Sequence, residues 1–217
     1  MGSLYYTIDC KLQTANCKLK MSLQIGITGV IGSGKSLVCR IFSALGVPVY
    51  SADDRAKWLL NHDEKLKKTV EALLGAEAYL PDGGYNRQWV AGKVFNNPIL
   101  LRELNAVVHP RVGEDTQAWL KLHSKAPYVV KEAAIMGKAG QNNSLDKVIV
   151  VHAPIDLRVM RVLQRDPQRS ETEIRDIIAR QVSDEERLKM ADFVVYNDDN
   201  QLVIPQIWQL HQLFSKK

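Results

Sequence analysis

Residues 29–36, Gly-Val-Ile-Gly-Ser-Gly-Lys-Ser, have the types and spacing of a loop that binds the phosphates of a nucleotide. The glycines let the backbone fold back so that successive N–H groups point at phosphate oxygens, and the helix expected next adds the positive end of its dipole. Lys35 can reach the β- and γ-phosphates, and the Ser36 hydroxyl can ligate Mg²⁺. The predicted nucleotide-binding residues here are Gly29, Gly32, Ser33, Gly34, Lys35, Ser36 and Leu37.

Two carboxylates follow the second apolar run of the chain, in the segment Ser51-Ala52-Asp53-Asp54. Ligands of parallel α/β sheets bind beyond the carboxyl ends of the strands, so a carboxylate here would face the phosphates. A kinase that phosphorylates a hydroxyl needs a group that accepts the proton, and Asp53 is the best-placed candidate for this general base. Aspartate also favours helix N-caps, so Asp53 has that alternative, unless Asp54 caps the helix instead.

Arginines are concentrated in the last third of the chain. Arg158, Arg161 and Arg165 are spaced i, i+3, i+7, which puts them on one face of a helix. Arginines on a lid that closes over the phosphates could stabilise the charge of a phosphoryl-transfer transition state. Most arginines on exposed helices only solvate the surface, and we favour Arg165 and Arg180 as the functional members.

Five short apolar runs must form the scaffold of this site, and stretches of helical character separate most of them. Near-continuous apolar runs suit strands that are buried on both faces of a parallel sheet. The first run leads into the glycine loop and a helix over Lys35–Leu45, which Gly46 and Pro48 end. We therefore predict a three-layer α/β fold of the P-loop NTPase type with a five-stranded parallel sheet. The predicted strands are Leu23–Thr28, Val47–Tyr50, Tyr128–Val130, Val148–His152 and Phe193–Tyr196.

The interval between the second and third strands is too long for a simple crossover and has helical character. We interpret residues 55–125 as an inserted helical subdomain that binds the second substrate, with a purely structural insertion as the alternative. A turn is expected at Pro-Asp-Gly-Gly, residues 81–84. The predicted helices are Glu64–Leu74, Asn86–Phe95, Pro98–His109 and one through Val112–His123.

Residues 158–187 are rich in charge and helical, with little apolar face. Residues 166–170 interrupt the helical pattern, and Ser170-Glu171-Thr172-Glu173 predicts a capping box for the next helix. A helical pair with a weak apolar stripe would be loosely anchored, as a mobile lid is, and we assign the lid to residues 165–187. An ordinary solvated helical hairpin is the alternative.

Bulk properties narrow the class of protein. The chain has 217 residues, a net charge of +5 and 46% hydrophobic residues, which suits one soluble α/β domain. The charge is mild and no basic tract is interleaved with aromatics, so we expect no nucleic-acid binding. No apolar run reaches the roughly 18 residues of a membrane span. Cys10, Cys17 and Cys39 have neither disulfide nor metal spacing, which indicates the cytoplasm, with Cys39 as a small core residue.

The N-terminus differs in character from the rest. Residues 1–20 lack helical periodicity and the apolar stretch of a secretory signal, and Met21 stands directly before the first strand. We interpret residues 1–21 as an extension, either a tag or an overlong start, with a short hairpin or disordered arm as the alternative. The catalytic domain is then 22–217, with its core at 22–54, 126–164 and 188–217.

Taken together, these residues resemble the dephospho-CoA kinase family over about Leu23 to the C-terminus. The P-loop alone is generic, but the His-Pro element and the closing Ala-Asp…Asn-Asp element are specific. The matching elements are residues 26–36, Ser51-Ala52-Asp53, Leu104-Asn105, His109-Pro110-Arg111-Val112, Pro154, Arg158, Arg161, Arg165-Asp166, Arg180-Gln181, Ala191-Asp192-Phe193-Val194 and Asn197-Asp198.

The resemblance implies transfer of the γ-phosphate of ATP to the 3′-hydroxyl of 3′-dephospho-CoA. Asp53 would be the base, and Lys35, Arg165 and Arg180 would stabilise charge. Substrate-binding residues would be Asp53, Lys57, His109 and Arg161, with the CoA part held by the insertion. The residues alone favour a packed or capping role for His109. Mg²⁺ would accompany ATP at Ser36, and we expect a monomer or small homo-oligomer without a membrane partner.

Several positions depart from the family pattern. The first Asp of Asp-Ala-Asp is Ser51, and Leu37 stands where threonine is frequent. After the third strand the chain has Glu132, which keeps a carboxylate suited to Lys35 or to a water on Mg²⁺, followed by Ala133-Ala134-Ile135-Met136-Gly137-Lys138. Gly137-Lys138 replaces a Phe-Glu pair, which affects acceptor contacts more than the reaction.

Two other functions deserve comparison. A shikimate- or nucleoside-kinase-like enzyme would explain the P-loop, Asp53 and the lid, but not the His-Pro and Asn-Asp elements. A GTP-dependent switch would read guanine with Asn-Lys-x-Asp and sense the γ-phosphate with Asp-x-x-Gly, and neither pattern occurs in the chain.

Overall fold

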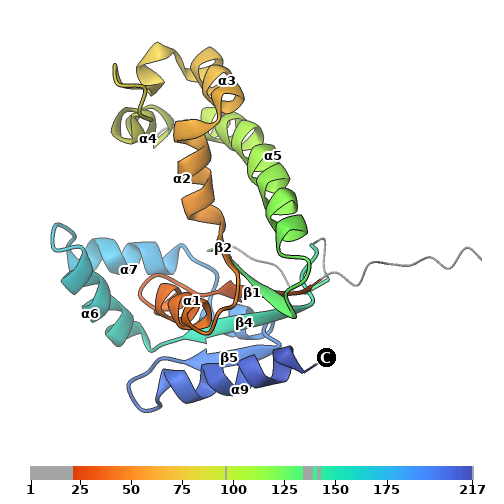
Figure 1. Ribbon diagram of the computed structural model, residues 1–217. Helices are drawn as coiled ribbons and strands as arrows, with labels where there is room; N and C mark the ends of the chain where they lie inside the picture. The colour runs from red at the N-terminus through yellow and green to blue at the C-terminus, as the bar shows by residue number, and fades with distance from the viewer. Residues whose placement is uncertain (1–21, 96, 134–138, 141–142, 217) are drawn as a thin grey trace, which may run out of the picture.

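A sheet of five parallel strands forms the centre of the computed structural model, which describes residues 22–95, 97–133, 139–140 and 143–216 (Figure 1). The order of the strands is β2-β3-β1-β4-β5, so the predicted five-stranded parallel sheet is confirmed. The extension 1–21 and the departures at 134–138 lie outside the described residues. The strands are β1 (Leu23–Thr28), β2 (Val49–Ser51), β3 (Tyr128–Glu132), β4 (Lys147–His152) and β5 (Phe193–Tyr196).

Helices cover both faces of the sheet, which explains why its central strands are almost continuously apolar. On one face, α1 (Lys35–Ala44) and α9 (Val203–Ser215) bury Phe42 and Ile207 against β1 and β4. On the other face, α8 (Asp184–Leu188) packs Leu188 against β4. The end of α5 (Pro98–Leu122) covers β2 there, where the Tyr50 hydroxyl donates to Asp115. These contacts give the three layers of the predicted fold.

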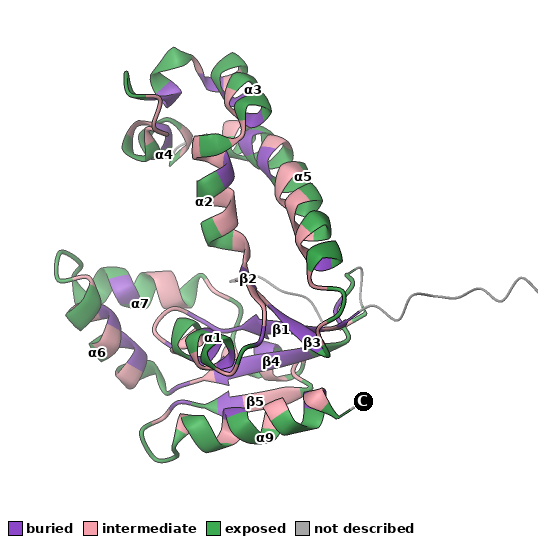
Figure 2. Ribbon diagram, in the orientation of Figure 1, coloured by how far each residue is buried: buried purple, intermediate pink, exposed green. Residues whose placement is uncertain are grey.

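The inserted helices connect the carboxyl end of β2 to the amino end of β3 and extend away from the sheet as a separate group (Figure 1). They are α2 (Ala52–His62), α3 (Glu64–Leu74), the 3-10 helix η1 (Ala76–Ala78), α4 (Arg87–Phe95) and α5. They share an apolar core around Leu66, Val70 and Leu104, and Figure 2 shows buried residues on their inner faces. Because this core is separate from that of the sheet, the helices form a subdomain of their own.

Two details of the insertion were predicted wrongly. The helices expected at Pro98–His109 and Val112–His123 are one continuous helix, α5, with Pro110 inside it. A proline removes one backbone donor but does not end a helix whose two halves are held by packing. Here Leu104 packs in the insertion core before the proline, and Trp119 packs against Tyr50 of β2 after it. The second detail is α2, which begins at Ala52 directly after β2, three residues before the predicted boundary at 55.

The predicted lid region contains α6 (Ile155–Arg165), α7 (Glu171–Ala179) and α8. The capping box of α7 is confirmed, since Ser170 and Glu173 hydrogen-bond reciprocally. The expectation of little apolar face is wrong for α6, because Val159 and Val162 are buried together with Ile174 of α7. The segment is therefore anchored by its own apolar cluster.

The bounds of two strands also differ from the prediction. β2 begins at Val49 instead of Val47, because the Val47 N–H donates to Phe42 O and so completes the turn after α1. β3 runs on to Glu132, which places that carboxylate in line with Ser51 and Ile27 of the neighbouring strands. In the part of the chain that is described, no helix is long and apolar enough to cross a membrane.

Candidate active site

The glycine loop connects β1 to α1 at the carboxyl edge of the sheet, where the sequence placed it. Gly32 and Gly34 have φ angles of +76° and +91°, which favour glycine because it lacks a Cβ. A Cβ at Gly32 would also lie 2.5 Å from the carbonyl oxygen of Arg158, so the loop can approach α6 only with glycine there. The start of α1 at Lys35 is therefore presented to a ligand together with the backbone N–H groups of the loop.

Buried contacts hold the loop in this shape. The Asn197 side chain donates to Ser33 O at 2.9 Å, and the Ser33 N–H donates to Val30 O. The Ser33 side chain is fully buried beneath Gly29 and does not line the cavity described below. The Ser33 side chain therefore shapes the loop from within, and its role as a nucleotide contact stays a prediction. The Asn-Asp element at the end of β5 acquires a physical role, because its asparagine supports the loop.

Lys35 and Glu132 form the closest charged contact of the site. Lys35 Nζ lies 2.6 Å from Glu132 Oε1, and both side chains are largely buried. The Ser36 hydroxyl donates to the same carboxylate oxygen at 3.4 Å. Cys39 is confirmed as a small buried residue of the core, and its burial together with the nearby Glu132 charge raises its pKa to about 12. The end of β3 thus supplies a carboxylate to both functional residues of the loop.

A cavity of about 450 Å³ opens over the loop. Its walls come from the loop, from α1 and from the lid helices, so nucleotide phosphates placed here would meet the N–H groups of the loop and Lys35. Arg40 belongs to it and was missed from the sequence; it lies one turn after Leu37 on the same face of α1. The lining residues are Gly29, Val30, Ile31, Gly32, Gly34, Lys35, Ser36, Leu37, Arg40, Arg161, Val162, Arg165 and Gln181.

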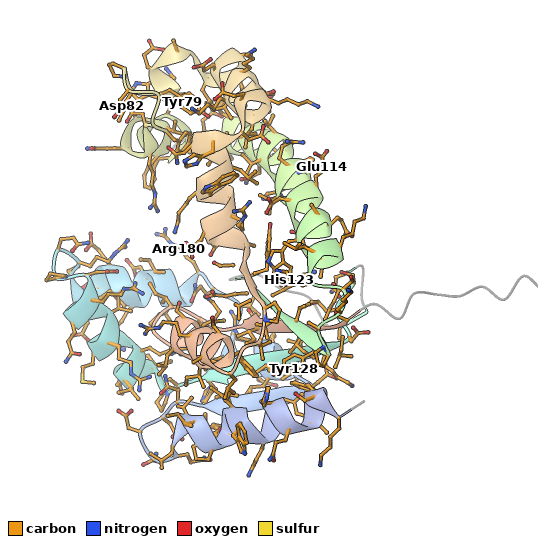
Figure 3. All side chains as sticks on the ribbon, viewed as in Figure 1. Tyr79, Asp82, Glu114, His123, Tyr128 and Arg180 are labelled. Carbon is orange, nitrogen blue, oxygen red and sulfur yellow. The ribbon has the colours of Figure 1, made fainter. Side chains whose placement is uncertain are left out.

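The lid meets the loop through a glutamine. Gln181 Oε1 accepts a hydrogen bond from the Ile31 N–H at 3.2 Å, and Gln181 lines the cavity. Arg180, its neighbour, is exposed and does not line this cavity; Figure 3 shows it between α7 and the lower part of α2. The sequence signal was the Arg180-Gln181 pair, from which we chose the arginine. The residue that contacts the loop is the glutamine.

The three arginines on α6 have different surroundings. Arg158 is 1% exposed and binds both oxygens of Asp184 at 3.3 and 2.9 Å, so it ties α6 to α8. Arg161 donates to Asn197 O at 2.8 Å and pairs with Asp199, and it lies in the cavity over the loop. Arg165, further along, is mostly exposed and pairs with Asp166 at 2.8 Å, which also raises its pKa. Of the three arginines predicted on one face of the helix, Arg158 is therefore structural, and Arg161 and Arg165 line the cavity.

The carboxylates after β2 lie in the first turn of α2. The cap of this helix is Ser51, whose hydroxyl accepts from the Asp54 N–H, so the alternative that Asp53 or Asp54 caps the helix is wrong. The Ser51 departure is thereby explained, because serine is a good N-cap. Asp54 binds Lys57 at 2.8 Å, and this contact lowers its pKa. Asp53 is exposed and has no hydrogen bond or ion pair with any residue that the structure describes.

The remaining predicted substrate residues lie apart from the loop. His109 is exposed on α5, so the packed or capping role that the residues favoured is not observed. Lys57 is exposed on α2, where Asp54 holds it. Neither residue lines the cavity over the loop, which does contain Arg161. The structure therefore separates Arg161 from the other predicted contacts of the acceptor.

A second cavity, of about 380 Å³, lies between the ends of β2 and β3 and the middle of α5. Glu132 belongs to its wall, and the partner of Glu132, Lys35, belongs to the first cavity. The Lys35–Glu132 pair is therefore the point at which the two cavities meet. The lining residues of the second cavity are Tyr50, Ala52, Gly113, Thr116, Gln117, Lys131, Glu132, Ala133, Asn143, Ser144 and Leu145.

Comparisons with known proteins agree with this geometry. The family model described as dephospho-CoA kinase matches residues 23–202. A dephospho-CoA kinase from Bacteroides fragilis is 36% identical over 197 residues, which are 91% of this chain and 95% of the relative. A crystal structure from Thermus thermophilus superimposes with a TM-score of 0.77 at 30% identity, covering 91% of this chain and all of the other. A dephospho-CoA kinase from Campylobacter jejuni gives a TM-score of 0.62 at 26% identity with the same coverage. The chain therefore belongs to the dephospho-CoA kinase family and is a kinase.

Proposed function

We propose that this protein transfers the γ-phosphate of ATP to the 3′-hydroxyl of the ribose of 3′-dephospho-CoA, giving CoA and ADP. Membership of the family and the P-loop geometry support the ATP-dependent reaction. The observation that carries the proposal is the Lys35–Glu132 contact of 2.6 Å, which joins a cavity over the P-loop to a cavity below the insertion. ATP, the phosphoryl donor, in the first cavity and dephospho-CoA, the acceptor, in the second cavity would meet at this pair.

Lys35 is proposed to neutralise the transferred phosphoryl group. An ammonium that contacts the phosphates acts on both the bound nucleotide and the transition state, in which charge is spread over the equatorial oxygens. Glu132 holds the Lys35 ammonium at the edge of the cavity until the phosphates compete for it. Arg165 lines the same cavity, and among the described residues its guanidinium is bound by the adjacent Asp166 alone. We therefore propose it as the second cation at the phosphates.

Asp53 is proposed as the general base. It lies beyond the carboxyl end of β2, next to Ala52, which lines the second cavity. Its carboxylate is exposed and has no partner in the described part of the chain, in contrast to Asp54, which Lys57 occupies. A base must be free to accept the proton of the 3′-hydroxyl while it holds that oxygen in line with the γ-phosphate. Of the two carboxylates, Asp53 meets this requirement.

Mg²⁺ is the metal that the site would hold together with ATP. The Ser36 hydroxyl and the Glu132 carboxylate lie 3.4 Å apart, and hard oxygen ligands of this kind suit Mg²⁺. Among the described residues, no cluster of three or more His, Cys, Asp or Glu forms a ready cage. This also fits Mg²⁺, which takes one or two protein ligands and completes its shell with phosphates and water. When bound, the ion would neutralise charge on the phosphates.

His109 and Lys57 are proposed as contacts of the part of the acceptor that extends along the insertion. Both are exposed on helices that rise from the second cavity, His109 on α5 and Lys57 on α2. Arg161 is proposed to act indirectly, because its guanidinium is bound to Asn197 and Asp199. In this role it fixes the strand end that supports the P-loop. A cytoplasmic location and a monomer or small homo-oligomer remain predictions.

An acceptor panel tests the proposed reaction. ADP release is measured with ATP and Mg²⁺ in the presence of 3′-dephospho-CoA, shikimate or individual nucleosides, and the phosphorylated product is identified by mass spectrometry. We expect turnover with dephospho-CoA and a gain of one phosphate at its ribose. Absence of turnover with dephospho-CoA, or faster turnover with shikimate or a nucleoside, would overturn the proposal. A strong preference for GTP over ATP would also count against it.

A further inference from the structure

Lys131 is a half-buried cation without a carboxylate partner, in the wall of the second cavity. Its Nζ donates to Gln24 Oε1 at 3.4 Å and to Ser144 Oγ at 3.3 Å, both long contacts to neutral oxygens. It forms no ion pair with any residue in the described part of the chain. Burial lowers the pKa of its ammonium, as expected for a charge that lacks compensation. A buried charge is costly unless an opposite charge pairs with it, so a bound anion would stabilise the Lys131 ammonium.

The charges around the cavity leave this lysine uncompensated. The carboxylate of the adjacent residue, Glu132, also belongs to the wall, but Lys35 neutralises it at 2.6 Å. Among the described lining residues of the second cavity, these are the two whose side chains carry a charge. The described part of the wall therefore carries one uncompensated positive charge, on Lys131. Its hydroxyls already donate within the protein, Tyr50 to Asp115, Thr116 to Val112 O and Ser144 to Gln24, so Lys131 is the group that would bind an anion.

The opposite wall of the cavity is open. Gly113 of α5 lines it, and a Cβ built there would meet no atom within 4 Å. Gln117, one turn further along α5, is exposed and has no hydrogen bond to any other described residue. The wall opposite Lys131 thus has space and an available amide, which is what a bound polar group requires.

We propose that Lys131 binds the diphosphate of the acceptor and so determines which acceptors the enzyme accepts. This inference rests on the proposed function, because the acceptor is taken to be dephospho-CoA. The diphosphate is the only anionic group of that molecule, and it is attached to the same ribose whose 3′-hydroxyl is phosphorylated. Since Lys131 and Glu132 both line this cavity, an anion bound at Lys131 would keep this ribose on the acceptor side of the Lys35–Glu132 pair.

Steady-state kinetics of the full-length chain test the assignment. Lys131→Met keeps the apolar stem and removes the charge, Lys131→Arg keeps the charge, and Lys121→Met on exposed α5 surface is the matched control. We expect Lys131→Met to raise the KM for dephospho-CoA by about 10- to 100-fold, the size of one charge-assisted hydrogen bond. The KM for ATP should stay within twofold, Lys131→Arg should retain most of the affinity, and the control should resemble the wild type.

Three outcomes would overturn the assignment in an enzyme whose wild type phosphorylates dephospho-CoA. They are an unchanged KM for dephospho-CoA in Lys131→Met, an equal rise in the KM for ATP, or equal impairment in Lys131→Arg. If the wild type itself gave no turnover, the proposed function would fail instead, so the two failures are distinguishable. Gly113→Leu provides a second test that leaves Lys131 in place. It fills the open wall and should also raise the KM for dephospho-CoA selectively, and a wild-type KM would contradict the site.

Discussion

Lys35 of the P-loop and Glu132 at the end of β3 form an ion pair of 2.6 Å between largely buried side chains, 97 residues apart in the sequence. The pair exists because β1 and β3 are neighbouring strands in register, with Ile27 opposite Glu132. A lysine with a single carboxylate partner can exchange that partner for phosphate oxygens when a nucleotide binds. The contact therefore identifies the position at which the two substrates are expected to meet.

Replacing Lys35 by alanine should impair both nucleotide binding and turnover, because the ammonium is proposed to contact phosphates in the ground state and in the transition state. We expect kcat to fall by about 10²-fold or more, the usual loss for one preorganised charge, with a higher KM for ATP. Initial rates over a range of ATP concentrations measure both effects. Unchanged kinetics could not be reconciled with a functional P-loop. Lys189→Ala, on the exposed surface of the chain, serves as the control.

Replacing Glu132 by glutamine should lower kcat by at least about tenfold, because the neutral amide no longer holds Lys35 and Ser36 by charge. We also expect the Mg²⁺ concentration for half-maximal rate to rise, since a carboxylate that suits the metal is lost. The rate is measured against Mg²⁺ at saturating ATP and dephospho-CoA. Glu103→Gln, exposed on α5, is the matched control. A wild-type rate and Mg²⁺ dependence in Glu132→Gln would remove this residue from the site.

Asp53 and Asp54 provide a matched pair within one helical turn. Asp53→Asn should keep ATP binding and lower kcat by roughly 10²-fold or more, the usual range for loss of a general base. Asp54→Asn removes the partner of exposed Lys57 and should change kcat by less than about threefold, because a surface ion pair contributes little. Binding of ATP by calorimetry and turnover are measured for both variants. The assignment of the base would be reversed if Asp54→Asn were the slower enzyme.

Substitutions of Gln181 and Arg180 should affect different kinetic constants. Gln181→Ala leaves the Ile31 N–H without its acceptor and should raise the KM for ATP several-fold, because the P-loop loses a contact that fixes its shape. Arg180→Ala should lower kcat with a smaller change in KM, if the arginine reaches the phosphates only when the lid closes. Equal effects of the two substitutions on both constants would show that the lid acts as one unit without this division of roles.

The contact of Asp115 with Arg55 should make stability depend on pH. Arg55 donates two hydrogen bonds to the carboxylate and Tyr50 a third, and these lower the pKa of Asp115. A carboxyl with a lower pKa in the folded state stabilises the protein above its unfolded pKa of about 3.9 and loses this contribution as the pH falls through the folded value. Asp115→Asn should therefore lower the free energy of unfolding at pH 7 by about 2 kcal/mol.

The difference between wild type and Asp115→Asn should stay constant from pH 7 to about pH 5 and narrow below about pH 4. Urea denaturation at several pH values measures it. Asp156→Asn is the control, since Asp156 pairs with Arg175 on the exposed surface and should cost less than about 1 kcal/mol at every pH. A difference that persists unchanged to pH 3 would show that the cost of Asp115→Asn comes from packing instead of charge.

Local patterns accounted for much of the fold. The strands Leu23–Thr28 and Phe193–Tyr196 and the helix Glu64–Leu74 were predicted with the observed bounds, because apolar periodicity and caps are properties of neighbouring residues. The division of α5 at Pro110 was wrong, since a local rule cannot register that packing holds the helix on both sides of the proline. The cap at Ser51 was missed for a related reason. Serine and aspartate both favour N-caps, and the sequence does not show which of these side chains reaches the Asp54 N–H.

The amino-acid sequence was sufficient to predict that a P-loop joins a strand to a helix, that a carboxylate follows the second strand, and that a helical insertion separates the second strand from the third. These are properties of short segments, in which residue type and spacing define backbone geometry. The three-dimensional structure was needed to show that Asn197 and Gln181 hold the loop, that Arg158 is buried, and that Lys131 has no counter-charge among the described residues. Such contacts join residues far apart in the chain, and their energy depends on burial and on distance, which no local pattern contains.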